Sequence, residues 1–178
     1  MRRAVFLDRD GVLNRSIIVD GMPKSPRTPD DTVLYDDVAQ AYRRLRDAGF
    51  LLIRVTNQPN IGRGSQSRET IDAINAKLDD LLDLDDIRVC PHDDGDGCHC
   101  RKPKPGLILD AAGTHDVDLE ASFMVGDRWR DTDAGRAAGC RTIWIARGYA
   151  EQAAEADFVC AGLGETADWI LRQKGGLE

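Results

Sequence analysis

Residues 4–11 read AVFLDRDG, an apolar run that ends in two closely spaced aspartates. The four apolar residues at its start are typical of a short buried strand in the centre of a parallel sheet. Asp8 and Asp10 would lie at the carboxyl end of that strand, where ligands bind in open α/β sheets. On an extended segment the two carboxylates would share one side, about 6–7 Å apart. Such a pair can divide acid, base and nucleophile roles, although a solvated turn fits the same residues.

The rest of the chain alternates between predicted strands and helices. Short apolar runs predict strands at residues 50–55, 87–89, 121–125, 141–145 and 157–159. Helical periodicity and end signals predict helices at residues 36–49, 67–84, 105–113, 131–138 and 166–173. This order predicts an α/β protein, with residues 1–178 forming a single domain.

Composition narrows the function classes. The chain has 178 residues, 42% of them hydrophobic and 31% charged, which is ordinary for a soluble globular protein. No apolar run approaches the ~20 residues of a membrane span, and no signal peptide precedes the first strand. We therefore expect a cytoplasmic protein, no membrane partner, and a monomer. The net charge of −7 argues against nucleic acid as a partner.

Residues 14–35 predict an irregular functional loop. Gly21 and the prolines at positions 23, 26 and 29 exclude a long helix or a central strand there. Because the segment follows the Asp pair directly, we expect it to cover or border the site as a short cap. Lys24 and Arg27 are cations that it could present to an anion.

Small polar residues follow the second predicted strand. Thr56 and Asn57 can donate hydrogen bonds to phosphate oxygens, although both are also good turn residues. Arg63, between Gly62 and Gly64, is a cation on a flexible loop. We consider Asn57 and Arg63 candidate substrate-binding residues.

A cluster of cysteines and histidines at residues 90–100 predicts a metal site. Cys90 and His92 form one closely spaced pair, and Cys98 and Cys100 form a second pair five residues later. Three thiolates and one imidazole suit tetrahedral zinc and leave no open position, so the metal would be structural. His99 lies between two ligands and would point away. Reduced surface thiols without a metal are the alternative.

Cations and a further carboxylate complete the pattern. Arg101, Lys102 and Lys104 precede a helix start, which is a plausible phosphate site or else a basic solvated turn. Asp127 follows the fourth predicted strand and, with Asp8, could hold a divalent cation such as magnesium. Asp131 could be an outer ligand or the cap of the next helix.

Five motifs in order resemble the haloacid-dehalogenase-type phosphohydrolases, and within them the small zinc-containing branch. They are Phe6-Leu7-Asp8-Arg9-Asp10-Gly11, Thr56-Asn57-Gln58, the cysteine/histidine loop, Cys100-Arg101-Lys102-Pro103 and Val125-Gly126-Asp127. The resemblance implies a Rossmann-like three-layer α/β/α sandwich with a mostly parallel sheet, short loop caps and a zinc-binding loop. It also implies a magnesium-dependent phosphatase.

The resemblance also implies roles for individual residues. Asp8 would form an aspartyl-phosphate, and Asp10 would protonate the leaving alcohol and then activate water. Thr56 and Lys102 would hold the phosphoryl group. Magnesium would bind Asp8, the Asp10 carbonyl and Asp127. The remaining substrate contacts would come from Arg101 and Arg128.

Within that branch two substrates compete, and both are small phosphorylated metabolites. Two extra arginines suit a sugar with a second phosphate, which points to removal of the 7-phosphate from D-glycero-D-manno-heptose 1,7-bisphosphate. Histidinol phosphate is the alternative, and Pro59-Asn60 departs from the usual Ser-Gly of the heptose enzymes. A non-catalytic zinc-stabilised scaffold and a phosphotransferase are the other functional hypotheses.

Overall fold

A computed structural model describes residues 1–152 and 154–173. Six parallel strands form one sheet in the order β5-β4-β1-β6-β7-β8. Their bounds are β1 (Ala4–Leu7), β4 (Leu51–Asn57), β5 (Asp86–Cys90), β6 (Phe123–Gly126), β7 (Arg141–Ile145) and β8 (Phe158–Cys160). The predicted parallel sheet is therefore confirmed.

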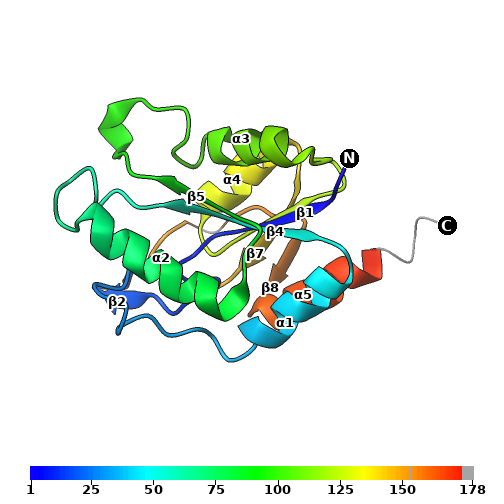
Figure 1. Ribbon diagram of the computed structural model, residues 1–178, viewed down its shortest axis with the longest axis horizontal. Coiled ribbons are helices and arrows are strands. Elements are labelled where there is room, and N and C mark those ends of the chain that lie inside the picture. The colour runs from blue at the N-terminus through cyan, green and yellow to red at the C-terminus, as the bar shows by residue number, and fades with distance from the viewer. Residues whose placement is uncertain (153, 174–178) are drawn as a thin grey trace.

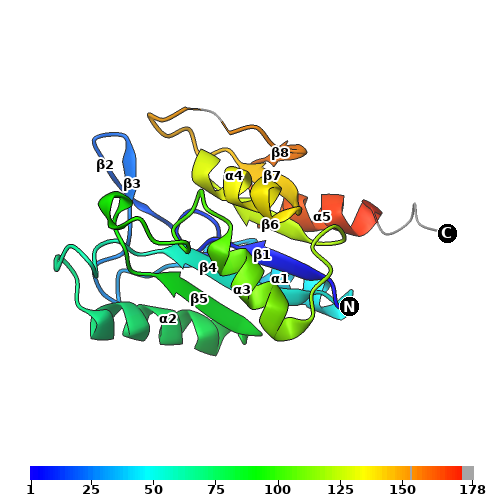
Figure 2. The same cartoon turned by 90° about the horizontal axis from the view of Figure 1, so that it is seen from above.

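Helices cover both faces of this sheet (Figures 1 and 2). The helices are α1 (Val38–Asp47), α2 (Arg68–Leu82), α3 (Gly106–His115), α4 (Trp129–Ala138) and α5 (Leu163–Gln173). Figure 1 shows α3 and α4 on one face and α1, α2 and α5 on the other. An apolar core forms on each face because successive residues of each strand point to opposite faces: Val5 and Leu7 pack toward α1 and α5, while Ala4 and Phe6 pack toward α3 and α4. The three-layer sandwich is thus confirmed.

Strand order places the candidate site. The chain runs outward from β1 to β4 and β5, then crosses back to β6 on the other side of β1. The order therefore reverses at β1, and in open α/β sheets the crevice at such a point binds ligands. The ends of β1, β4 and β6 meet there, which brings Asp8, Thr56 and Asp127 to one edge of the sheet.

The segment at residues 14–35 differs from its prediction as an irregular loop. It contains an antiparallel hairpin of β2 (Ile17–Val19) and β3 (Met22–Lys24), which form a separate two-stranded sheet. Asp20 and Gly21 connect the strands with φ angles of 52° and 72°, the positive values that a tight hairpin turn of type I′ needs. The Asp-Gly pair is a hairpin signal that the prolines obscured. Pro23 fits because a two-stranded sheet has only edge strands.

Element boundaries shift by a few residues elsewhere. Thr56 and Asn57 belong to β4 itself, and α4 begins at Trp129. The zinc-loop segment contains a short 3₁₀ turn, η1 (Asp94–Asp96). None of the helices in the described ranges has the length and hydrophobicity required to cross a bilayer.

Candidate active site

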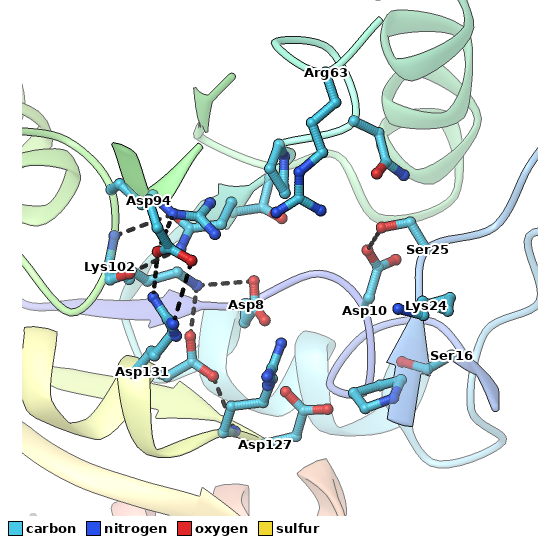
Figure 3. Close-up of a pocket in the computed structure, with 18 residues that line it drawn as sticks. Asp8, Asp10, Ser16, Lys24, Ser25, Arg63, Asp94, Lys102, Asp127 and Asp131 are labelled. Carbon is cyan, nitrogen blue, oxygen red and sulfur yellow. Dashed lines mark hydrogen bonds and ion pairs between the residues drawn. The ribbon is translucent and has the colours of Figure 1, made fainter. Parts of the chain in front are cut away.

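A polar cleft of about 270 Å³ opens at the carboxyl ends of β1, β4 and β6 (Figure 3). The central strands supply Asp8, Thr56 and Asp127, and the other walls come from the hairpin, the loop after β4, the zinc-loop segment and the start of α4. Its lining residues are Asp8, Asp10, Ser16, Pro23, Lys24, Ser25, Thr56, Asn57, Pro59, Asn60, Arg63, Asp94, Arg101, Lys102, Asp127, Arg128, Arg130 and Asp131. The cleft thus contains every residue predicted for phosphoryl transfer.

Lys102 lies at the floor of this cleft and is almost fully buried. Its Nζ is 2.9 Å from an oxygen of Asp8 and 2.6 Å from an oxygen of Asp131, as the dashed lines of Figure 3 show. The same ammonium donates to the carbonyl oxygen of Val55 at 2.8 Å. All three N–H donors therefore have acceptors, which is how a buried ammonium is tolerated.

The electrostatics of Asp8 and Lys102 depend on each other. Burial raises the pKa of Asp8 to about 6, with Lys102 opposing and Asp131 adding to the shift. Burial alone lowers the pKa of Lys102, but the carboxylates of Asp131 and Asp8 outweigh it and the net shift is upward. Lys102 is thus a fixed cation at neutral pH, next to a carboxylate that titrates closer to neutrality than usual.

Asp10 has a different environment. Its carboxylate accepts hydrogen bonds from Arg9 at 2.9 Å, Asn14 at 2.9 Å, Ser25 at 2.7 Å and Gln58 at 3.1 Å. Burial opposes ionisation, but the Arg9 charge and these hydrogen bonds prevail and lower the pKa of Asp10 to about 2. Asp8 and Asp10 are therefore two neighbouring carboxyl groups with widely separated pKa values, the condition for distinct acid–base roles.

Three carboxylates form a candidate site for a hard cation. One oxygen from each of Asp8, Asp127 and Asp131 lies within 4.8 Å of the others. Oδ1 of Asp127 is buried and has no hydrogen-bond partner among the described residues, while Oδ2 accepts from the Tyr149 hydroxyl at 2.7 Å. Burial, and then Asp8 and Asp131, raises the pKa of Asp127. An orphaned buried oxygen among like charges fits a magnesium ion.

Gly11 permits this arrangement. Its φ is +86°, and a Cβ at that position would overlap the carboxylate of Asp127. Glycine is therefore required for both backbone conformation and close approach. The turn after Asp10 and the third carboxylate thus depend on one residue.

Thr56 and Asn57 occupy different positions in the site. Thr56 is buried at the cleft wall, and its hydroxyl accepts from the Gln58 amide at 2.9 Å. The Asn57 side chain donates to the backbone carbonyl of Lys102 at 3.0 Å and accepts from its backbone N–H at 3.1 Å. Asn57 lines the cleft, but its amide group is engaged with the loop that carries Lys102.

The cations predicted to bind substrate all line the cleft, and each is paired with a carboxylate. The pairs are Arg63 with Asp93, Arg101 with Asp94, and Arg128 with Glu151, at N–O distances of 2.6, 2.8 and 2.7 Å. Sequence reasoning did not predict these partners, because the acids lie 30, 7 and 23 residues away along the chain.

The cysteine and histidine side chains of the zinc loop converge. One ligand atom from each of Cys90, His92, Cys98 and Cys100 lies within 4.8 Å of the others. The His92 Nδ1 is 3.3 Å from the Cys100 sulfur and 3.6 Å from the Cys90 sulfur. Such separations are compatible with four ligands around one zinc ion, given Zn–S and Zn–N bonds near 2.3 and 2.0 Å. His99 instead contacts Asp110 at 3.1 Å.

The structure adds residues that the sequence did not single out as candidates. Ser16 and Ser25 reach the cleft from the hairpin segment, and Arg130 and Asp94 reach it from α4 and η1. Asp131 has the predicted capping role, because its Oδ2 accepts from the Arg128 N–H at the start of α4. Its Oδ1 binds Lys102, a contact that the sequence did not predict. Only the Asp-Gly turn at residues 20–21 offered a local signal for the hairpin.

A family model described as HAD-hydrolase-like matches residues 99–166. Together with relatives at 35% and 36% identity, this match shows that the chain belongs to the HAD-like hydrolase family. Several relatives match almost the whole chain, and two of them are named D-glycero-beta-D-manno-heptose-1,7-bisphosphate 7-phosphatase. The protein from Bordetella bronchiseptica is 35% identical over 96% of this chain and 99% of its own length. The protein from Yersinia pestis is 36% identical over 98% and 92%.

Solved structures also match nearly the whole chain. The crystal structure of D,D-heptose 1,7-bisphosphate phosphatase from B. bronchiseptica, complexed with magnesium and phosphate, matches with a TM-score of 0.82 and 33% identity, covering 96% of this chain and 99% of that one. A HAD-like phosphatase from Mesorhizobium loti matches with a TM-score of 0.74 and 29% identity, covering 95% and 86%.

Proposed function

We propose that this protein is a magnesium-dependent phosphomonoesterase that removes the 7-phosphate of D-glycero-D-manno-heptose 1,7-bisphosphate. The observation that carries the proposal is the buried cluster in which Lys102 contacts Asp8 and Asp131 beside the orphaned oxygen of Asp127. Phosphoryl transfer requires positioned charges around the transferring group more than covalent chemistry by the protein. The heptose specificity follows the relatives, which carry that activity in their names.

In the first step, an oxygen of Asp8 attacks phosphorus and the bond from phosphorus to the sugar oxygen breaks. Asp10 gives its proton to the departing oxygen, while Lys102 and Thr56 hold the phosphoryl oxygens. Because its hydrogen bonds hold Asp10 as a carboxylate in the free protein, its side chain must leave Arg9 and Ser25 and take this proton from solvent water before the transfer.

In the second step, Asp10 accepts a proton from water. The water oxygen attacks phosphorus, the bond between phosphorus and Asp8 breaks, and inorganic phosphate leaves with Asp8 restored as a carboxylate. Lys102 neutralises Asp8 before the first step and again after the second, when Asp8 carries no phosphoryl group. The contact with Asp131 holds the Lys102 ammonium in place.

Asp8, the Asp10 carbonyl and Asp127 would hold magnesium, with Asp131 next to them. When bound, magnesium neutralises charge on the transferring phosphoryl group.

Zinc in the loop at residues 90–100 is a further part of the proposal. Cys90, His92, Cys98 and Cys100 would bind it with four protein ligands, which leaves no position for catalysis. The metal would stabilise the loop that carries Asp94 to the cleft wall and Asp93 to its contact with Arg63. A cytoplasmic location, a monomeric state and a single domain over residues 1–178 complete the proposal.

The first experiment compares phosphate release from heptose 1,7-bisphosphate, histidinol phosphate and p-nitrophenyl phosphate, with magnesium and with a chelator. We expect magnesium-dependent release with the largest kcat/KM for the bisphosphate. Asp8→Asn should lower kcat at least about 10³-fold because it removes the nucleophile. The folded state of that variant is checked by circular dichroism.

Other outcomes identify the alternatives. A preference for histidinol phosphate would overturn the sugar assignment and leave the phosphatase chemistry. Transfer of the phosphoryl group to an added sugar rather than to water would indicate a phosphotransferase. No release from any of the three by folded, metal-loaded protein would favour the non-catalytic scaffold.

A further inference from the structure

The carboxylate of Asp94 lies between two arginines at the wall of the cleft. Its Oδ1 accepts from Arg101 at 2.8 Å and from Arg130 at 2.7 Å. All three side chains line the cleft that also contains Asp8. Two guanidinium groups that converge on one oxyanion form an anion-binding site, here called the distal anion site and defined by Arg101 and Arg130.

The two arginine side chains are more buried than the Asp94 carboxylate that they bind. The Arg101 and Arg130 side chains are 12% and 27% exposed, whereas the Asp94 side chain is 55% exposed. The cations thus belong to the wall, and the carboxylate lies on the solvent side. Ion pairs with one exposed partner contribute little free energy, so a stronger anion can replace Asp94.

Both arginines have other contacts that hold them in place when Asp94 leaves. Arg101 donates to the backbone carbonyl of His92 at 3.0 Å. The Arg130 guanidinium lies 5.0 Å from the centre of the Trp129 ring. The distal anion site therefore does not depend on Asp94 for its position.

We propose that Asp94 is a resident counter-ion that the second phosphate of a bisphosphate substrate displaces, and that Arg130 joins Arg101 in binding that phosphate. The inference rests on the proposed function and specifies how its substrate is selected. Two guanidinium groups match a phosphate dianion better than they match one carboxylate. A monophosphate has no second anion to displace Asp94, so it leaves the distal site closed.

The test measures the ratio of kcat/KM for heptose 1,7-bisphosphate to that for heptose 7-phosphate, two substrates that differ only in the second phosphate. Arg130→Gln should lower this ratio about tenfold, the size of one charge-assisted hydrogen bond. Asp94→Asn keeps the shape but removes the competing charge, so it should raise the ratio about threefold. Arg136→Gln is the matched control on the same helix, because Arg136 pairs with Asp133 and does not line the cleft.

The outcomes are distinct. A lower ratio in Asp94→Asn, or an unchanged ratio in Arg130→Gln, would overturn the displacement. Equal kcat/KM of the wild type for both substrates would overturn the distal anion site and leave the phosphatase proposal intact. Absence of magnesium-dependent release from both substrates would overturn the proposed function and this inference with it.

Discussion

Lys102 is the residue on which the charge balance of the site depends. It is buried together with the two carboxylates that it contacts, Asp8 and Asp131. Removing one partner from a buried ion pair costs several kcal/mol, because it leaves an uncompensated charge. The cluster is therefore sensitive to any single change in charge.

Asp131→Asn tests that sensitivity. The amide keeps the size of the side chain but leaves Lys102 with one carboxylate partner. It also weakens the hydrogen bond from the Arg128 N–H that caps the start of α4. We expect kcat to fall about 10²-fold. Asp133→Asn on the same helix is the control, because Asp133 is partly exposed and pairs with Arg136. Equal kcat values for Asp131→Asn and the wild type would show that Asp8 alone is sufficient to hold Lys102.

Asn57→Ala separates two interpretations of a residue that was predicted to bind substrate. Its side chain holds both backbone groups of Lys102. Their loss should misplace the ammonium and lower kcat about tenfold. A direct substrate role would instead raise KM and leave kcat unchanged. Asn60→Ala is the control, because Asn60 lines the cleft but bonds Gln66 within its own loop. Steady-state kinetics on p-nitrophenyl phosphate provide both parameters.

At the scale of elements, the zinc loop and the hairpin are the segments that shape the cleft outside the sheet. The loop carries Asp93 and Asp94, which pair with Arg63, Arg101 and Arg130. The hairpin carries Ser25, which donates to Asp10. Each segment has little apolar core of its own. The position of the cleft wall therefore depends on these ion pairs and hydrogen bonds and, for the zinc loop, on the proposed metal.

Cys98→Ser tests the zinc proposal. We expect loss of bound zinc, a lower melting temperature by about 5 °C or more, and a higher KM, because the acids that orient the arginines would lose their support. Zinc content by atomic absorption and thermal unfolding by calorimetry check it. Cys140→Ser is the control, because Cys140 is buried beside α4 and lies outside the four-residue cluster. Wild-type protein that contains no zinc after expression in zinc-supplemented medium would contradict the proposal.

For the whole molecule, charge is distributed unevenly. The chain has a net charge of −7, yet arginines and lysines line the cleft in numbers similar to its acids. An anionic substrate is thus bound by local cations against an acidic background. The carboxylates at the bottom of the cleft repel one another when no cation is present, and this repulsion links the stability of the fold to pH and magnesium.

The pKa shifts give the direction in which stability changes with pH. In the metal-free protein the pKa of Asp8 rises from 3.8 to about 6, and burial together with its neighbours also raises that of Asp127. A raised pKa means that the contribution to stability is complete below the unfolded value and is lost as the pH rises through about 6. Asp10 behaves in the opposite way, and its contribution is lost only as the pH falls through about 2.

Magnesium should therefore stabilise the protein more at about pH 7.5 than at about pH 5, because only ionised carboxylates repel each other and bind the ion. The measurement is the shift in melting temperature on adding magnesium chloride at each pH. Asp8→Asn, which lacks one of the titrating groups, should show a smaller difference between the two. Equal shifts in the wild type at both pH values would contradict the assignment of magnesium to the carboxylates of the cleft.

Most of the sheet and the predicted strand-end residues could be anticipated from local patterns. An apolar run followed by a small or acidic residue places Asp8, Thr56 and Asp127 at strand ends, because the period and length of a strand are local properties. The spacing of the cysteines and His92 likewise predicted their convergence. The hairpin is harder to predict, because three prolines argue against a central strand and its turn signal is confined to Asp20 and Gly21.

Local sequence patterns thus predict which chemical groups reach the edge of the sheet. The contacts among these groups come from the three-dimensional fold: Lys102 with Asp131, Ser25 with Asp10, and Asp94 with Arg130. The physical reason is that strand and helix signals lie within a few neighbouring residues. The charge and hydrogen-bond partners of a cleft, in contrast, often lie far apart along the chain, 15 residues for Ser25 and Asp10 and 36 residues for Asp94 and Arg130, and they are set by how those segments dock.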